Sequence, residues 1–194
     1  MTGVQTCALP IYVEDGYHDD PDVVAGYVAG LGAAGINIED STDEKLISPK
    51  AHAAKVAAIK KLSPEVFVNA RADTYWLDQD ANVVATLKRA EAYVEAGADG
   101  IFVPGATDPA DLQELTANIP LPVNVLVVPG LSLAELADLG VRRVSTGSLP
   151  YRAAIDAAMQ VAQNVRNGVP PPAATAYPAM QARLVEFDRL NQPG

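Results

Sequence analysis

A short unit recurs along the chain: an alanine-rich segment, a glycine, and then a run of β-branched and other apolar residues. It occurs in residues 33–40 (AAGINIED), 95–105 (EAGADGIFVPG) and 137–147 (ADLGVRRVSTG). Helices that alternate with near-continuous apolar strands are typical of a parallel sheet covered by helices. The unit therefore predicts an α/β fold.

The same pattern extends over most of the chain. We predict strands at residues 35–40, 66–71, 99–105, 123–128 and 142–147, with a short strand at 12–15. The helices between them are expected at residues 21–35, 48–62, 80–97, 108–119 and 131–140. In the third helix, apolar side chains recur at helical spacing and predict one buried stripe: Val83, Val84, Leu87, Ala90, Tyr93 and Val94.

The junctions agree with these elements. Asp19 or Asp20 is placed to cap a helix that begins at Pro21, and Asp108 stands before Pro109 in the same way. Helix ends are expected at glycines, which adopt left-handed backbone at low cost: Gly35, Gly97 and Gly140.

Two architectures fit this alternation, a β/α barrel and an open doubly wound sheet. No glycine-rich phosphate-binding loop follows any predicted strand, which disfavours the dinucleotide-binding form of the open sheet. We therefore predict a (β/α)8 TIM-barrel type that is incomplete, with about six strands, two short of a closed barrel. Residues 12–168 form the partial barrel, and residues 169–194 form a proline-rich connector and a C-terminal helix.

Polar side chains stand at the carboxyl ends of the predicted strands, which form the active-site face of a β/α barrel. Glu14 and Glu39 suit Mg²⁺, which prefers oxygen ligands, although solvated loop carboxylates are the alternative. Arg71 is placed to bind a substrate carboxylate, with Asn124 nearby as a second substrate-binding residue. The alternative for Arg71 is an ion pair with Asp73. Neither histidine lies in a ligand-like cluster, and surface positions are expected for His18 and His52.

Composition excludes several classes of partner. The formal net charge is −10 and the basic residues are scattered, so neither nucleic acid nor an anionic membrane is an expected partner. The chain has 1 cysteine and no apolar run of the roughly 18 residues that span a bilayer. With no secretory signal pattern at the N-terminus, a cytoplasmic location is expected.

Four segments together resemble the isocitrate lyase/phosphoenolpyruvate mutase superfamily. They are VEDGYHDDPDVV with GAAGINIEDS, VNARADTY, RAEAYVEAGADGIFVPG, and PLPVNVLVVPGLSLAELADLGVRRVSTGS, and the similarity runs from Val13 to Arg166. The resemblance implies a Mg²⁺-dependent (or Mn²⁺-dependent) barrel that makes or breaks C–C or P–C bonds in small oxo or hydroxy acids. It also implies that the missing units of the barrel are the first two βα units, and it implies a homotetramer in which the last helix is exchanged between subunits.

The resemblance assigns roles to single residues. The family's metal-site acids fall on Glu14 and Glu39, and its substrate-binding arginine falls on Arg71. Tyr12 stands where the family has an aspartate, so one metal-site acid is replaced. The loop at residues 41–50 (STDEKLISPK) has no cysteine, which argues against isocitrate and methylisocitrate as substrates.

The first residues raise a separate question. Residues 1–11 resemble the translation of a sequencing-library adapter, and we interpret them as an artefact that also changed an aspartate codon at Tyr12. On this interpretation the natural parent is a C–C lyase acting on an oxaloacetate-like dicarboxylate. Phosphonomutase-type P–C chemistry is the second choice, and an inactive structural fragment is the third. The chain as given is expected to be inactive and to self-associate.

Overall fold

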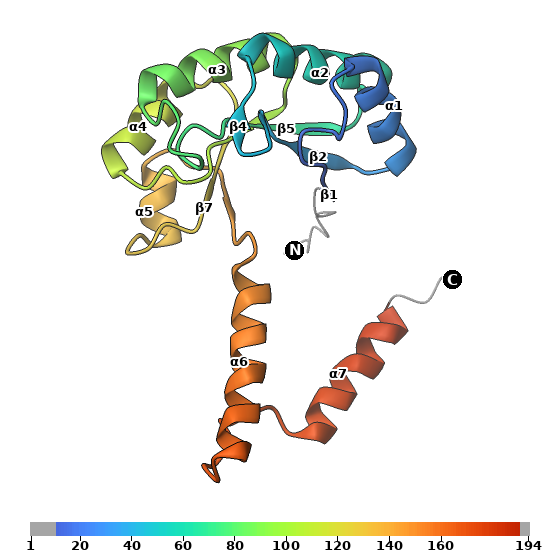
Figure 1. The fold of residues 1–194 in the computed structure, drawn as a ribbon, viewed down its shortest axis with the longest axis vertical. Helices are drawn as coiled ribbons and strands as arrows, with labels where there is room; N and C mark the ends of the chain where they lie inside the picture. Colours follow the sequence, from blue (N-terminus) through green and yellow to red (C-terminus); the bar gives the residue numbers. More distant parts are fainter. Residues whose placement is uncertain (1–10, 191–194) are drawn as a thin grey trace, which may run out of the picture. The chain divides into compact units, whose positions relative to one another are not determined.

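The computed structural model describes residues 11–190, which form two compact units (Figure 1). The first unit ends at Thr146 and the second begins at Gly147. The elements of the first unit are β1 (Ile11–Tyr12), α1 (Pro21–Leu31), β2 (Gly35–Ile38), β3 (Ser41–Thr42), β4 (Lys45–Leu46), α2 (Pro49–Leu62), β5 (Phe67–Arg71), α3 (Val83–Glu95), β6 (Gly100–Phe102), α4 (Pro109–Asn118), β7 (Val123–Leu126), α5 (Leu133–Asp138) and β8 (Arg143–Ser145).

The main sheet has 6 parallel strands in the order β1-β2-β5-β6-β7-β8. This order follows the sequence without the reversal that defines a doubly wound sheet. A flat sheet of this width would hold its edge strands about 24 Å apart. Here the Tyr12 hydroxyl on β1 lies 3.1 Å from Ser145 Oγ on β8, so the sheet is strongly curled. The prediction of an incomplete barrel is confirmed.

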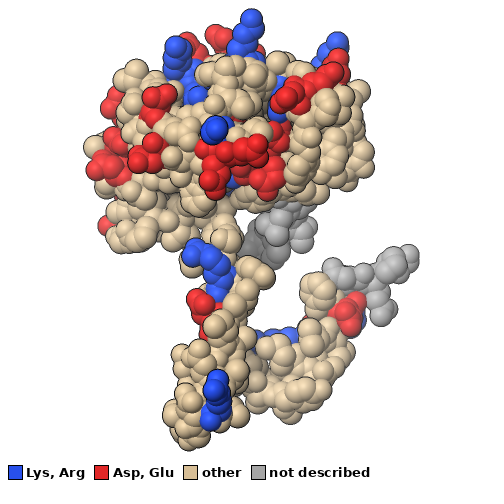
Figure 2. All heavy atoms as spheres, viewed as in Figure 1, with Lys and Arg blue, Asp and Glu red and all other residues tan. Residues whose placement is uncertain are grey.

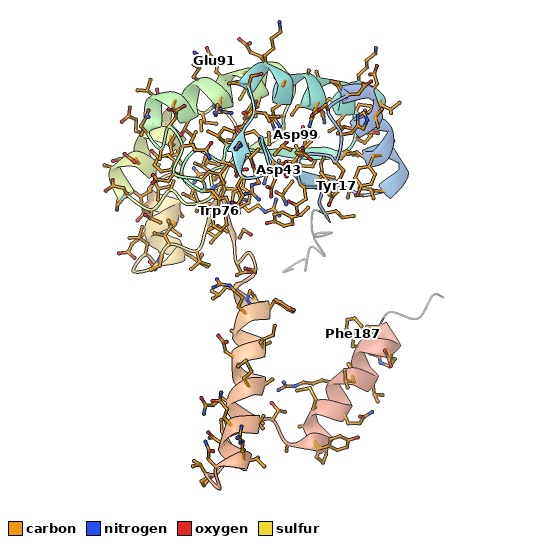
Figure 3. The ribbon with its side chains drawn as sticks, in the orientation of Figure 1. Tyr17, Asp43, Trp76, Glu91, Asp99 and Phe187 are labelled. Carbon is orange, nitrogen blue, oxygen red and sulfur yellow. The ribbon has the colours of Figure 1, made fainter. Side chains whose placement is uncertain are left out.

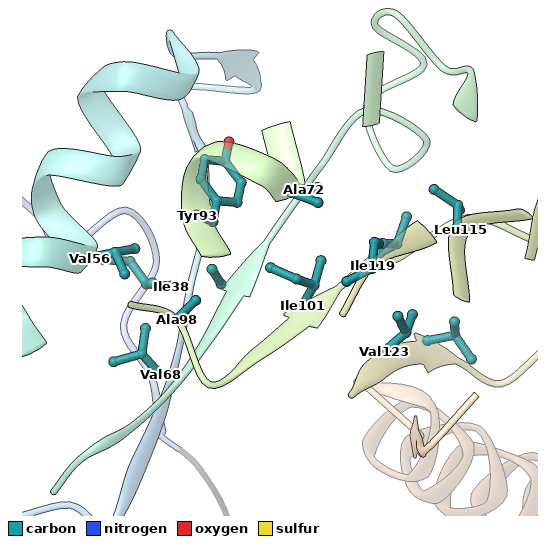
Figure 4. Packing of buried hydrophobic residues seen from close by; sticks show 14 of the residues in the cluster. Ile38, Val56, Val68, Ala72, Tyr93, Ala98, Ile101, Leu115, Ile119 and Val123 are labelled. Carbon is teal, nitrogen blue, oxygen red and sulfur yellow. The ribbon is translucent and has the colours of Figure 1, made fainter. Parts of the chain in front are cut away.

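The hydrophobic core lies between the outer face of this sheet and its helices (Figure 4). Successive strand residues point to opposite faces, and the outward residues are aliphatic. On β2, Ile36 and Ile38 are fully buried in this way, and on β5 Val68 and Ala70 are. The alternate residues of the same strands are therefore left for the inner face, and toward the carboxyl ends they are polar: Asn37 on β2, and Asn69 and Arg71 on β5.

The helix ends follow the sequence except at Gly35. Asp20 caps α1 by accepting a hydrogen bond from the Asp22 backbone at 2.9 Å, and Asp108 caps α4. The left-handed residue that ends α1 is Gly32, whereas Gly35 is already the first residue of β2; the prediction for Gly35 was wrong by one turn. The predicted stripe of α3 is also wrong at Val84, which is 76% exposed because the buried face turns through Thr86 and Arg89 instead.

The second unit contains α6 (Leu149–Arg166) and α7 (Tyr177–Leu190). Neither helix has a buried residue. The predictions included α7 but not α6, the longer of the two. No helix within residues 11–190 has the length and hydropathy to cross a bilayer. The proposed artefact lies almost wholly in residues 1–10, outside the described residues, and the predicted boundaries at residues 12 and 168 remain predictions.

Candidate active site

The inner face of the curled sheet carries a row of polar residues. Ile38 is the register partner of Ala70, so Glu39 and Arg71 follow as the next neighbours, and their side chains point to the other face. Arg71 is paired with Phe102, and Phe102 with Asn124. Glu14 joins the row because its backbone carbonyl accepts a hydrogen bond from Glu39 N–H at 2.7 Å. Glu14, Glu39 and Arg71 therefore lie at the carboxyl ends of neighbouring strands, and Asn124 lies level with Arg71, two strands away on β7.

Arg71 is held on several sides. Its Nη1 donates to the Glu39 carboxylate, and its Nε and Nη2 each lie 2.8 Å from Asp73 Oδ1. The guanidinium carbon also lies 5.5 Å from the centre of the Phe102 ring. The ion pair with Asp73, the alternative considered for Arg71, is thus present together with a second pair to Glu39. A guanidinium fixed in this way is oriented before any anion arrives.

Glu39 is the most perturbed acid of the row. Burial raises its pKa to about 7, and the neighbouring Asp73 and Glu14 carboxylates add to this effect, although Arg71 opposes it. Glu14 is exposed and has left-handed backbone, with φ of 48°. Side chains other than glycine rarely adopt this conformation, and such residues concentrate at functional sites.

Asn124 is buried, and within the described residues neither atom of its amide group has a hydrogen-bond partner. A buried amide without partners costs free energy, so a ligand that bonds to it recovers that cost. Two other inner-face amides are partly satisfied: Asn69 Nδ2 donates to Asn37 Oδ1 at 2.6 Å, whereas Asn37 Nδ2 has no partner within the described residues. Asn124 is thus an available amide beside Phe102, the residue whose ring contacts the guanidinium of Arg71.

The donor set fits a hard divalent cation. Mg²⁺ is usually bound through one or two carboxylates, with water and substrate supplying the other oxygens. Glu14 and Glu39 are adjacent carboxylates, and a cation would relieve the mutual repulsion that raises the pKa of Glu39. Residues 11–190 contain no group of three or more acidic, histidine or cysteine side chains that could hold a metal ion. Figure 2 shows acidic side chains gathered in the middle of the visible face of the first unit.

Three loops surround these strand ends. Tyr17, Asp43 and Trp76 lie in the loops that follow β1, β3 and β5 (Figure 3). Thr42 Oγ1 donates to Asp15 Oδ2 at 2.5 Å, which joins the β3–β4 hairpin to the loop after β1. Lys55 is buried beneath the same loop and donates to the Asp15 carbonyl at 2.8 Å. The loops are therefore tied to one another and to α2.

The sequence did not predict that three residues of this region act together, although Tyr93 was expected to be buried. Asp40, Arg89 and Tyr93 form a buried cluster behind Glu39, with Arg89 Nη1 at 2.8 Å and Tyr93 OH at 2.5 Å from Asp40 Oδ2. The signal for Arg89 was its position, four residues before Tyr93 on the buried stripe of α3. His52 was expected at the surface and is fully buried instead, with its ring 4.5 Å from that of Tyr93. His18 is exposed, as expected.

A surface groove of about 500 Å³ lies elsewhere, between α3 and α4. Its lining includes Leu87, Val94 and Ile119, together with the charged side chains of Lys88 and Glu91. These residues belong to the outer helical layer and include no member of the polar row. The groove is therefore not part of the candidate active site.

Comparison with known proteins agrees with the fold. The family described as phosphoenolpyruvate phosphomutase matches residues 1–166. An uncharacterized protein of Mycobacterium tuberculosis is 57% identical over 94% of this chain and 70% of its own length. The oxaloacetate decarboxylase of Pseudomonas aeruginosa is 32% identical over 71% of this chain, and the match spans 51% of that enzyme.

Solved structures give the same result. A protein of Burkholderia cenocepacia, provisionally named a lyase/mutase, has a TM-score of 0.81 and 32% identity over 90% of this chain and 69% of its own. Another from the same organism, provisionally named a phosphonomutase, has a TM-score of 0.72 and 38% identity over 85% of this chain and 72% of its own. A phosphonopyruvate hydrolase solved with oxalate and Mg²⁺ has a TM-score of 0.73 at 23% identity over 95% of this chain and 72% of its own, which shows a shared fold.

Proposed function

Because this chain belongs to the phosphoenolpyruvate phosphomutase family, we propose that its site binds a small oxo-dicarboxylate of the oxaloacetate type and cleaves a C–C bond through an enolate. The observation that supports this most is the row Glu14, Glu39, Arg71 and Asn124 at neighbouring strand ends. It combines a pair of carboxylates for Mg²⁺ (or Mn²⁺), a fixed guanidinium for a carboxylate and an unpartnered amide. The sequence similarity to oxaloacetate decarboxylases favours this substrate class.

Each residue has a separate task in this proposal. Arg71 binds one substrate carboxylate, and the bond that it now gives to Glu39 is exchanged for one to the substrate. Asn124 bonds to a second oxygen, and Phe102 excludes water from one side of the guanidinium. Glu14 and Glu39 would hold Mg²⁺, which supplies positive charge for the oxygen on which negative charge develops. Asp73 keeps the guanidinium in place when Glu39 turns away.

P–C bond chemistry on a phosphonopyruvate-type substrate is the second candidate. The similarity to the protein of Burkholderia cenocepacia provisionally named a phosphonomutase favours it. Both substrates carry an α-oxo carboxylate, so Arg71 and the Mg²⁺ site would have the same roles. A tetramer with exchange of the last helix, and a cytoplasmic location, complete the proposal.

We expect no measurable turnover from the chain as given, because Tyr12 occupies the position of a metal-site acid. A phenol is uncharged at neutral pH and is a poor ligand for Mg²⁺. Binding is therefore the first measurement. Titration calorimetry of oxalate in the presence of Mg²⁺ should show binding that Tyr12→Asp strengthens and Arg71→Met weakens by at least about tenfold, the loss expected for a hydrogen bond between charged groups. Arg142→Met, which removes an exposed arginine, is the matched control.

The reaction itself is tested with Tyr12→Asp. Pyruvate or oxalate release from oxaloacetate should depend on Mg²⁺ and on Arg71, measured against the Arg71→Met protein to subtract the reaction that free Mg²⁺ promotes. Conversion of phosphonopyruvate in place of oxaloacetate would favour the second candidate. Absence of both oxalate binding and turnover would contradict the proposal and favour a non-catalytic protein.

A further inference from the structure

Two polar side chains of helix α3, Arg89 and Tyr93, extend through the core to the end of β2. Arg89 and Tyr93 are both buried and both reach Asp40 Oδ2, at 2.8 Å and 2.5 Å. Arg89 Nη1 also donates to the Ile47 carbonyl at 3.0 Å, at the end of the β3–β4 hairpin. One face of an outer helix is therefore bonded to the residue that directly follows Glu39.

Asp40 also forms a hydrogen bond to the loop that follows β5. Its other oxygen, Oδ1, accepts a hydrogen bond from the Asp73 backbone N–H at 2.8 Å. The Asp73 carboxylate then accepts from Ser41 Oγ at 2.9 Å and from Arg71 Nε at 2.8 Å. A continuous chain of hydrogen bonds thus runs from α3 through Asp40 and Asp73 to the guanidinium of Arg71.

Each buried charge along this path of hydrogen bonds needs an opposite charge beside it. Asp40 and Asp73 are each fully buried, and a buried carboxylate is costly unless it is paired and hydrogen-bonded. Arg89 is the cation paired with Asp40, and Arg71 is the cation paired with Asp73. Apolar side chains at positions 89 and 93 would pack α3 against the sheet without this cost, so packing alone does not account for the polar pair.

We infer that Arg89 and Tyr93 are positioning residues for Arg71, acting through Asp40 and the backbone of Asp73. Their side-chain hydrogen bonds go to Asp40, to the Ile47 carbonyl and to one another, whereas the row of site residues lies on the inner face of the sheet. Their effect is to hold the Asp40 carboxylate in one orientation, which fixes the Asp73 backbone and hence the acceptor of the Arg71 Nε–H bond. The inference rests on the proposed function only in taking Arg71 as the residue that binds the substrate carboxylate.

Two conservative variants test it. Arg89→Lys keeps the positive charge but cannot reproduce the planar set of donors. Tyr93→Phe removes one hydroxyl and leaves Asp40 paired with Arg89, so it keeps the protein folded even if Arg89→Lys does not. Lys88→Met is the matched control, because Lys88 is the exposed neighbour of Arg89 on the same helix.

The first readout is the ¹H–¹⁵N signal of Arg71 Nε, assigned by its loss in Arg71→Lys. A hydrogen-bonded Nε–H exchanges slowly with water, and we expect both test variants to shift the signal and to speed its exchange, while Lys88→Met does not. The backbone amide signals of each variant must show that the protein is still folded. The second readout is the affinity for oxalate with Mg²⁺, which should fall at least about tenfold in Arg89→Lys.

The outcomes separate this inference from the proposed function. If the unaltered chain binds no oxalate, the proposed function fails, and the Arg71 Nε signal alone decides the positioning role. If both variants are folded and leave that signal as it is in Lys88→Met, the inference is wrong, and Arg89 and Tyr93 serve stability only. If Arg89→Lys does not fold, Tyr93→Phe decides by the same signal.

Discussion

At the scale of single residues, His52 is a buried polar ring beside the Tyr93 ring and near the cations of Lys55 and Arg89. It is fully buried on α2, and neither ring nitrogen has a partner within residues 11–190. Burial lowers its pKa to about 3, and the cations of Lys55 and Arg89 act in the same direction. The imidazole is therefore neutral in the folded protein at every pH at which the protein is normally handled.

This pKa predicts a loss of stability in acid. The unfolded chain protonates His52 near its ordinary pKa of 6.5, whereas the folded chain does so near 3, so protons favour the unfolded state as the pH falls between these values. The free energy of unfolding should fall by up to about 1.4 kcal/mol per pH unit from this group. Urea unfolding at a series of pH values should show a shallower dependence for His52→Leu than for the unaltered chain or for the exposed His18→Gln. Parallel pH profiles would contradict the assignment.

The site residues could be predicted from the sequence where their place at the end of a strand was enough to locate them. Glu14, Glu39 and Arg71 each stand at the end of a strand, and strand ends of a parallel sheet meet at one edge. The partners of these residues could not be found in this way. Asp40 and Arg89 lie 2.8 Å apart in space but on different elements, and only the packing of α3 against the sheet brings them together.

At the scale of elements, the β3–β4 hairpin is fastened at both sides. Thr42 on β3 bonds to Asp15, and Gln79 bonds to β4 and the turn: its Nε2 donates to the Glu44 carbonyl at 2.8 Å, and its Oε1 accepts from Leu46 N–H at 3.1 Å. Gln79 thus acts as a neighbouring strand would. We therefore predict that the hairpin is rigid and stays beside the carboxyl ends of the strands.

Removing the Gln79 amide should loosen the hairpin. In Gln79→Ala we expect the Leu46 amide to exchange with solvent about threefold to tenfold faster, as one hydrogen bond of ordinary strength is lost. Gln113→Ala is the control, because Gln113 is exposed on α4. Hydrogen exchange followed by NMR measures both. An unchanged rate at Leu46 would mean that Thr42 and the turn hold the hairpin without Gln79.

The elements were predictable where local pattern and packing agree. All six strands of the main sheet were expected, because their outward residues are aliphatic and glycines precede several of them. The hairpin was missed because β3 and β4 are too short for any periodicity. Helix α6 was missed although its sequence is rich in alanine, since it lacks the strand that followed each earlier helix.

At the scale of the whole molecule, α6 presents an apolar face without a partner inside its own unit. At 100° per residue, one side carries Tyr151, Ile155, Val161 and Val165, and the opposite side carries Asp156, Gln160 and Gln163. The four apolar side chains are between 40% and 69% exposed. A helix of this kind is typical of a surface that another chain covers.

We therefore predict that the chain self-associates through α6. Val161→Lys with Val165→Lys places two charges on the apolar side, where burial between subunits would be costly. Gln160→Lys with Gln163→Lys adds the same charge to the polar side and is the matched control. Sedimentation velocity should show an oligomer for the unaltered chain and the control, and a monomer for the apolar-side variant. A monomer for the unaltered chain, or equal distributions for the two double variants, would contradict the prediction. The choice of side is decisive here, because a general effect of added charge would shift both variants alike.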